Sequence, residues 1–189
     1  MQRFIEIWVL LFQIVIGVFI FFGTSIFLSK KWGAPWVISS QKKISRMLEL
    51  VELKASDTLI DLGAGDGRIL IYAAHQYGCK AIGVEIDPIR FILANIFIRW
   101  HKVGKLAQIH WGNIFEFDIS SANVVTVYLT RQANAKLLGY FEEHLRPGSK
   151  IVSNAFPIKE WTPILIDDSN YIFVYEIGRT GIDTHYEFV

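Results

Sequence analysis

Cysteine, excess charge and clustered histidine are nearly absent from this sequence, and each absence excludes a class of protein. Cys79 is the only cysteine among 189 residues, so the chain can form neither an intramolecular disulfide nor a cysteine-rich metal site. The 5 histidines are scattered without the spacing of metal ligands, which argues against a bound metal. A formal net charge of +1 provides no overall field that would attract nucleic acid. Partners must therefore be inferred from local motifs.

Charge is also missing from one long stretch near the N-terminus, where no charged residue occurs between Ile7 and Leu28. That length matches the ~20 residues that a helix needs to cross a bilayer. The apolar core of a signal peptide is shorter, at ~7–15 residues, and a buried soluble helix usually has a polar face. The sequence therefore predicts one N-terminal transmembrane helix, with residues 1–32 as a membrane anchor and residues 33–189 as a single folded domain.

The flanks of this apolar stretch predict its orientation. Basic residues are more numerous on its C-terminal side, namely Lys30, Lys31, Lys42, Lys43 and Arg46, whereas Arg3 lies on the other side. Positively charged flanks stay on the cytoplasmic side of a membrane. Trp8 and Trp32 lie near the two ends of the stretch, where indole rings favour the interface. We expect a single-pass membrane protein whose folded domain faces the cytoplasm.

Beyond a break at residues 33–36, apolar strands alternate with helical patterns. A helix capped by Ser39 or Ser40 comes first and is expected to cover the edge of a sheet. Five strands are predicted at Thr58–Leu62, Lys80–Glu85, Leu106–Trp111, Val124–Tyr128 and Lys150–Asn154. Helices are predicted at residues 68–77, 87–103 and 131–145, and closing hairpins near residues 164–166, 171–175 and 185–189. This order predicts an α/β fold with a doubly wound, mostly parallel, seven-stranded type of sheet.

The turn after the first strand is rich in glycine. Residues 58–68 read TLIDLGAGDGR, with glycines at positions 63, 65 and 67. Glycine permits positive φ and lets a ligand approach the backbone closely. Asp61 would lie at the carboxyl end of the strand, where open α/β sheets bind their ligands. The stretch therefore predicts a ligand-binding loop.

Glu85 ends the next strand and suggests which ligand the loop binds. A carboxylate about 20 residues after a glycine loop can accept hydrogen bonds from both hydroxyls of a ribose, and Ile86 can pack on the adenine. Arg68 replaces the third glycine of the dinucleotide fingerprint, and no Gly-Lys-Ser/Thr follows for a mononucleotide loop. Asp61 and Asp66 would repel phosphates but attract the ammonium and sulfonium groups of S-adenosylmethionine. The pattern from Asp61 to Gly67 resembles motif I of class I methyltransferases that use this cofactor.

Further motifs extend the resemblance from the anchor to about Pro163. They are GAPWV at 33–37, DLGAGDGRI at 61–69, GVEIDP at 83–88, VYLT at 127–130, LRPGSKIVS at 145–153 and FPIKEWTP at 156–163. In these the chain resembles the membrane-anchored protein-lysine methyltransferases, which include the mitochondrial enzymes that act on the ATP synthase c-subunit and the adenine nucleotide translocase. The family has shorter prokaryotic relatives, and the chain resembles a prokaryotic-type member. The resemblance implies a Rossmann-like methyltransferase fold.

The resemblance also implies the residues of the site. The cofactor would be bound by Asp61, Leu62, Gly63, Ala64, Gly65, Gly67, Glu85, Ile86, Asn113 and Ile114. The acceptor would be positioned by Pro35, Trp36, Tyr128, Thr130 and Phe156, with the first two over the cofactor and the others at the entrance. No general base is proposed, because a dry, aromatic entrance lowers the pKa of an incoming lysine by desolvation.

Three functions stay open at this stage. The leading hypothesis is an S-adenosylmethionine-dependent N-methyltransferase that acts on lysines of a membrane-associated protein, with residues 7–28 in the membrane and no nucleic-acid partner. Tethering would raise the effective concentration of the enzyme near such substrates. The alternatives are methylation of a lipid or small hydrophobic molecule, and a catalytically silent module that only binds the cofactor. The sequence predicts neither the oligomeric state nor the identity of the substrate.

Overall fold

The computed structural model describes residues 4, 6–13, 15–17, 23 and 38–179. The described residues of the N-terminal stretch are helical, but most of residues 18–37 lie outside the described part. No helix among the described residues has both the length and the apolar character needed to cross a membrane. The predicted span at residues 7–28 is only partly described and stays a prediction. The predicted strand at residues 185–189 lies outside the described residues.

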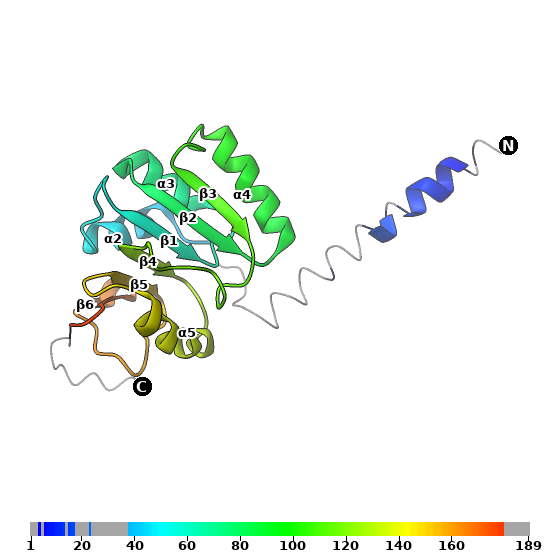
Figure 1. The fold of residues 1–189 in the computed structure, drawn as a ribbon. Coiled ribbons are helices and arrows are strands. Elements are labelled where there is room, and N and C mark those ends of the chain that lie inside the picture. The colour runs from blue at the N-terminus through cyan, green and yellow to red at the C-terminus, as the bar shows by residue number, and fades with distance from the viewer. Residues whose placement is uncertain (1–3, 5, 14, 18–22, 24–37, 180–189) are drawn as a thin grey trace.

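Seven strands form one mixed sheet (Figure 1). Their order across the sheet is β3-β2-β1-β4-β5-β7-β6, in which β1 to β5 are parallel and β7 lies antiparallel between β5 and β6. The strands are β1 Thr58–Leu62, β2 Lys80–Glu85, β3 Ala107–Trp111, β4 Val124–Val127, β5 Lys150–Asn154, β6 Leu165–Asp167 and β7 Ile172–Glu176. The doubly wound, mostly parallel sheet and its closing hairpin confirm the predicted fold class. The carboxyl ends of β1 to β5 share one edge, which we term the carboxyl edge.

Four α-helices, the first of which precedes the first strand, and one 3₁₀ helix accompany the strands of the described domain. They are α2 Gln41–Leu50, α3 Arg68–Tyr77, α4 Pro88–Trp100, α5 Arg131–His144 and η1 Asp168–Asn170. Side chains cap three of the four α-helices, because Ser40, Asp87 and Thr130 each accept hydrogen bonds from backbone N–H groups of the first turn. Helix α3 ends as predicted at Gly78, whose φ of 67° closes the last turn.

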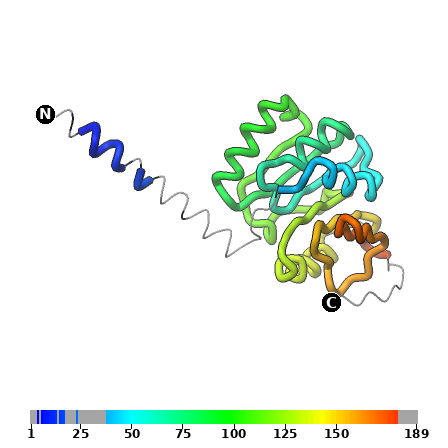
Figure 2. Tube along the Cα trace, turned by 180° about the vertical axis from the view of Figure 1, so that it is seen from behind, coloured from blue at the N-terminus to red at the C-terminus, as the bar shows by residue number. Residues whose placement is uncertain are grey.

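Two apolar cores cover the two faces of the sheet. Consecutive strand residues point to opposite faces, so Leu59 joins the core beneath α2, α3 and α4, whereas Ile60 joins the core beneath α5. Figures 1 and 2 show α3 and α4 together at one end of the molecule, with α5 at the other end. One expectation was wrong: α2 covers a face of the sheet rather than its edge. Its Met47 shares a core with Val152 of β5 and Val174 of β7.

Candidate active site

The glycine loop leaves β1 at the carboxyl edge and is shaped by its backbone. Gly63, Gly65 and Gly67 have φ values of 84°, 56° and 77°, so all three occupy a region that side chains other than glycine rarely adopt. The N–H groups of Gly63 and Ala64 both donate to the carbonyl oxygen of Val84, each at 3.0 Å. The loop is therefore fixed to β2, the neighbouring strand.

A fourth glycine, Gly83, permits this close approach and was not predicted as part of the site. A Cβ atom there would lie 2.6 Å from Ala64 Cβ and 2.7 Å from Leu70 Cδ1, which is far inside normal contact. Gly83 pairs with Asp61 in the sheet, so it lies directly beside the strand that carries the loop. A missing side chain in β2 thus lets the loop and α3 pack onto the sheet.

The carboxylate of Glu85 lies at the end of β2 and is only 3% exposed. Its Oε2 accepts a hydrogen bond from Gly65 N at 2.8 Å, and its Oε1 accepts one from Asp87 N at 2.9 Å. Burial raises the pKa of Glu85 above its ordinary value, although the two backbone N–H groups oppose this rise. Each carboxylate oxygen can accept a second hydrogen bond, so Glu85 keeps the capacity to bind hydroxyl groups.

Asp61 is the most strongly perturbed acid of the loop region. Burial raises its pKa from 3.8 to about 7, the hydrogen bond from Thr126 opposes the rise, and the charges of Glu85 and Asp66 add to it. Thr126 Oγ1 donates that bond to Asp61 Oδ1 at 2.7 Å from the adjacent strand β4. A cationic ligand beside Asp61 would favour its ionised form. Thr126 was missed by the sequence analysis, although a polar residue within the apolar run VVTV was a signal.

Arg68 ties the loop to the segment that enters the domain. Its guanidinium forms an ion pair with Asp66, and its Nη1 donates to the carbonyl oxygen of Ser39 at 3.0 Å. Ser39 Oγ in turn accepts a hydrogen bond from Asn154 Nδ2 at 3.4 Å, at the carboxyl end of β5. Ser39 therefore contacts both the cofactor loop and the carboxyl end of β5. Pro35 and Trp36, predicted to lie over the cofactor, precede it and fall outside the described residues.

The predicted acceptor residues of β4 and β5 lie at the same edge. Tyr128 is half-buried directly after β4, and Thr130 caps α5 by accepting from Ala133 N at 3.3 Å. The half-buried ring of Phe156 lies 5.8 Å from the guanidinium carbon of Arg131. The structure thus brings Tyr128, Thr130 and Phe156 to one side of the glycine loop, and their contact with an acceptor stays a prediction.

Two buried asparagines beside these residues were not predicted. Asn134 donates from Nδ2 to Ser153 Oγ at 3.1 Å and to the carbonyl oxygen of Phe156 at 2.9 Å. Asn154 donates to Ser39, as described above. Both side chains are 0% exposed, yet neither amide oxygen has a hydrogen-bond partner within the described part of the chain. Buried polar atoms without partners are uncommon and mark positions where a donor can be accepted.

The remaining predicted cofactor residues differ in their surroundings. Leu62 and Ile114 pack in the core beneath α5, and Ala64 packs in the opposite core. Their side chains therefore support the site through core packing. Ile86 stays half-buried at the carboxyl edge. Asn113 accepts from Phe115 N at 3.1 Å and donates to Glu116 Oε1 at 2.8 Å, so its side chain holds the turn after β3. Its predicted contact with adenine is untested.

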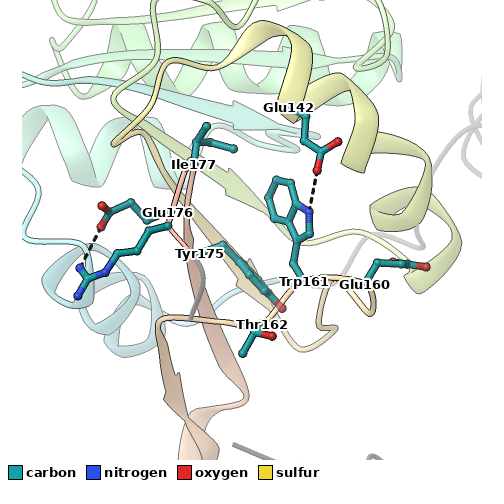
Figure 3. Close-up of a pocket in the computed structure, with 9 residues that line it drawn as sticks. Glu142, Glu160, Trp161, Thr162, Tyr175, Glu176 and Ile177 are labelled. Atoms are coloured by element: carbon teal, nitrogen blue, oxygen red, sulfur yellow. Dashed lines mark hydrogen bonds and ion pairs between the residues drawn. The ribbon is translucent and has the colours of Figure 1, made fainter. Parts of the chain in front are cut away.

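A cavity of about 560 Å³ lies apart from this site (Figure 3). Trp161 donates to Glu142 Oε1 at 3.2 Å and its ring centroid lies 6.0 Å from that of Tyr175. Glu176, also in its wall, pairs in the sheet with Lys150, the first residue of β5. The cavity therefore extends toward the edge opposite the carboxyl edge, and it does not belong to the glycine loop.

The described residues fit a nucleoside cofactor without phosphates. Glu85 is a buried acceptor at the end of β2, and Asp61 is a buried acid that a cation would ionise. The one arginine of the loop is engaged by Asp66 and Ser39, so it is not presented to a phosphate. Gly63 cannot carry a side chain without crowding, since a Cβ atom there would lie 3.1 Å from Leu129 Cδ2. Sheet order, loop and carboxylates together define a class I S-adenosylmethionine-dependent methyltransferase.

Comparisons with known proteins extend this assignment to a family. The model of the ANTKMT methyltransferase domain matches residues 61–165. The chain is 42% identical over 154 residues to a protein-lysine N-methyltransferase of Saccharolobus islandicus (strain REY15A), covering 77% of this chain and 94% of that relative. It is 28% identical to the adenine nucleotide translocase lysine N-methyltransferase of Mus musculus, covering 78% of this chain and 65% of that protein. The chain belongs to the ANTKMT methyltransferase domain family.

A solved structure agrees with the fold and the cofactor. It is an RNA methyltransferase from Salinibacter ruber in complex with S-adenosyl-L-homocysteine, 36% identical, with a TM-score of 0.74. The match covers 80% of this chain and all of the other. The protein is thus a methyltransferase whose cofactor is S-adenosylmethionine, as predicted.

Proposed function

We propose that the protein transfers methyl groups from S-adenosylmethionine to the ε-amino groups of lysines in a membrane-associated protein. One observation carries the choice of acceptor: the Saccharolobus islandicus relative named a protein-lysine N-methyltransferase is 42% identical and is matched over 94% of its length. The mouse relative, whose named substrate is the adenine nucleotide translocase, supports the same acceptor. The absence of charge between Ile7 and Leu28 supports a membrane-anchored enzyme. The basic residues that follow this stretch support a catalytic domain on the cytoplasmic side.

The chemistry requires a neutral amine held in line with the methyl group. The bound cofactor supplies an activated methyl group on a sulfonium centre. The protein must align the amine and let it lose its proton, and an apolar entrance favours the neutral amine. Tyr128 and Phe156 supply half-buried aromatic surface at the carboxyl edge. The amide oxygens of Asn134 and Asn154 can accept N–H hydrogen bonds from the amine, which orients its lone pair.

RNA is the second candidate acceptor, because the Salinibacter ruber structure that resembles this chain is named an RNA methyltransferase. A lipid or small hydrophobic molecule is the third, since a membrane anchor would serve that reaction equally well. The net charge of +1 argues against RNA, and the names of the lysine-methylating relatives argue against a lipid.

Fractionation of the methylated product distinguishes these acceptors. The full chain would be incubated with S-adenosylmethionine carrying a labelled methyl group and a membrane extract, and the product divided into protease-treated, nuclease-treated and solvent-extracted portions. The proposal predicts label that only the protease removes from the macromolecular fraction. Label released by nuclease supports RNA, and label in the organic phase supports a lipid. Either of these results in the absence of labelled protein would refute the proposal.

A further inference from the structure

Helix α4 has apolar side chains on the face that it turns away from the protein. Ile92, Ile96 and Trp100 are 49%, 51% and 76% exposed. They are spaced four residues apart, so they form one continuous row along the helix, which we term the α4 stripe. Single exposed apolar residues are common, but three in a row on one helix form an apolar face that has no partner within the described part of the chain.

The inner side of α4 is already occupied. Ala94 and Ile98 are buried in the core, and the helix contacts β2, β3 and α3. The α4 stripe therefore cannot serve the packing of its own domain, and Figure 1 shows α4 on the outside of the molecule. A surface helix of a soluble protein normally has polar residues on this side.

Charge along the segment that carries the stripe has one sign. Residues 88–115, which include α4 and β3, contain no Asp or Glu, although the whole chain has 18 acidic residues against 19 basic ones. Arg99, Lys102 and Lys105 are exposed at the C-terminal end of the stripe. A near-neutral protein thus presents apolar and basic side chains together on one surface.

A second exposed indole lies on the same part of the molecule. Trp111 is 65% exposed at the end of β3, and its Nε1 donates to the carbonyl oxygen of Ile86 at 2.9 Å. That contact holds the ring beside the segment that leads into α4. Trp100 therefore ends the stripe at one side, and Trp111 lies near the start of the helix. Indole rings favour the interface between water and lipid.

We propose that the α4 stripe, with Arg99, Lys102 and Lys105 beside it, is a docking surface for the headgroup region of an anionic lipid bilayer. The apolar side chains would enter the boundary of the acyl chains, and the basic side chains would contact lipid phosphates. Nucleic acid fits less well, because Ile92 and Ile96 gain nothing from a phosphate backbone. A two-fold contact with a second copy fits less well too, because it would bury two surfaces of the same basic charge against each other.

This surface has a consequence for the active site. Helix α4 begins at Pro88, only three residues after Glu85, so the stripe extends away from the carboxyl edge where the cofactor binds. A bilayer lying along α4 would hold the entrance next to the lipid surface. The inference goes beyond the proposed function, since it requires neither a lysine acceptor nor an inserted N-terminal anchor.

Environment-sensitive probes on the full chain test the proposal. A nitrobenzoxadiazole fluorophore would be attached in the variants Ile96→Cys on α4 and Ala135→Cys on α5, which is also an exposed helix position. Native Cys79 is 0% exposed and burial raises its thiol pKa to about 11, so it should not be labelled at neutral pH. With vesicles containing phosphatidylglycerol, we expect a blue shift and a several-fold rise in emission at position 96 and no change at position 135.

Charge reversal provides the matched control. Arg99→Glu with Lys102→Glu should abolish the change at position 96, whereas Lys136→Glu with Lys159→Glu, at exposed positions away from α4, should leave it intact. Equal emission from both probe positions would overturn the proposal. So would a change at position 96 that needs no lipid and follows protein concentration, or one caused by RNA. If the chain floats with the vesicles while position 96 stays silent, the α4 surface is refuted and the N-terminal anchor stands.

Discussion

The cofactor side and the acceptor side of the carboxyl edge are built differently. Around β1 and β2 the site consists of backbone: three glycines with positive φ, and a Glu85 carboxylate bound by two N–H groups. Around β4 and β5 it consists of side chains from distant positions, such as Asn134 with Ser153, and Asn154 with Ser39. A backbone site is suited to one invariant cofactor, whereas a side-chain site can be changed to suit different acceptors.

The difference suggests that the two sides can be disrupted separately. Substitutions around Glu85 should affect cofactor binding whatever the acceptor is. Substitutions around Asn154 should affect the acceptor and leave the affinity for the cofactor unchanged. Variants that lose both functions together would show that the two sides form one cooperative unit.

Glu85→Gln is expected to have the largest effect on the cofactor side. An amide keeps one acceptor oxygen, but its NH₂ group would face the N–H of Gly65 or Asp87. Hydrogen bonds to charged groups contribute about 1.5–3 kcal/mol, so the affinity for S-adenosylhomocysteine should fall by roughly 10- to 150-fold. Calorimetric titration measures this fall. The exposed Glu52→Gln variant is the control, and an unchanged affinity in Glu85→Gln would refute the site.

Gly83→Ala should destabilise the fold itself. The added Cβ atom would lie within 2.7 Å of atoms in Ala64 and Leu70, and overpacking of this kind costs about 1–3 kcal/mol. Denaturant unfolding should therefore show a lower free energy of unfolding. Gly139→Ala is the matched control, because nothing lies within 4 Å of its added Cβ atom and alanine favours a helix. Similar losses in both variants would contradict the close packing at Gly83.

Asp61 should make stability depend on pH. Its pKa rises from 3.8 to about 7 on folding, so between these values the folded chain holds a proton that the unfolded chain has lost. Its contribution is fully present below about pH 4 and falls by about 1.4 kcal/mol per pH unit until about pH 7. Asp61→Asn removes this contribution, so its free energy of unfolding relative to wild type should rise between pH 5 and pH 7. Parallel pH profiles for the two proteins would exclude the raised pKa.

Asn154→Ala addresses the acceptor side and should have the smallest effect. Loss of one hydrogen bond to the acceptor amounts to about 1 kcal/mol, or roughly a fivefold fall in kcat/KM for the acceptor. The affinity for S-adenosylhomocysteine should stay at the wild-type value. Asn95→Ala is a control for loss of an asparagine, because Asn95 Nδ2 donates to the carbonyl oxygen of Phe91 within its own helix. Weaker cofactor binding in Asn154→Ala would show that the cofactor side and the acceptor side are coupled.

The cofactor side was readable from sequence because its signals are local. The glycines and Asp61 lie within one strand and turn, and Glu85 ends the next strand, so strand and turn patterns were sufficient to place them. The strands, the caps at Ser40 and Asp87, and the end of α3 at Gly78 also follow from short patterns. Local chemistry thus predicted most of the described fold.

Contacts between distant residues could not be read in this way. Thr126 meets Asp61 across 65 positions, and Ser39 meets Asn154 across 115. No pattern within a single element indicates either contact, because both depend on strand order and on how the entering segment crosses the sheet. The predicted position of α2 was wrong for the same reason. The sequence showed the apolar face of this helix but did not show which part of the sheet that face would cover.

The chemical identity of the methylated group tests the central claim most directly. Protein labelled by the full chain with S-adenosylmethionine and a membrane extract would be hydrolysed to amino acids, with Glu85→Gln as the matched control that binds the cofactor weakly. The account predicts that the label is recovered as methylated lysine with the wild-type chain and is strongly reduced with the variant. Recovery of the label in a modified nucleoside or a lipid, with none in lysine, would contradict it.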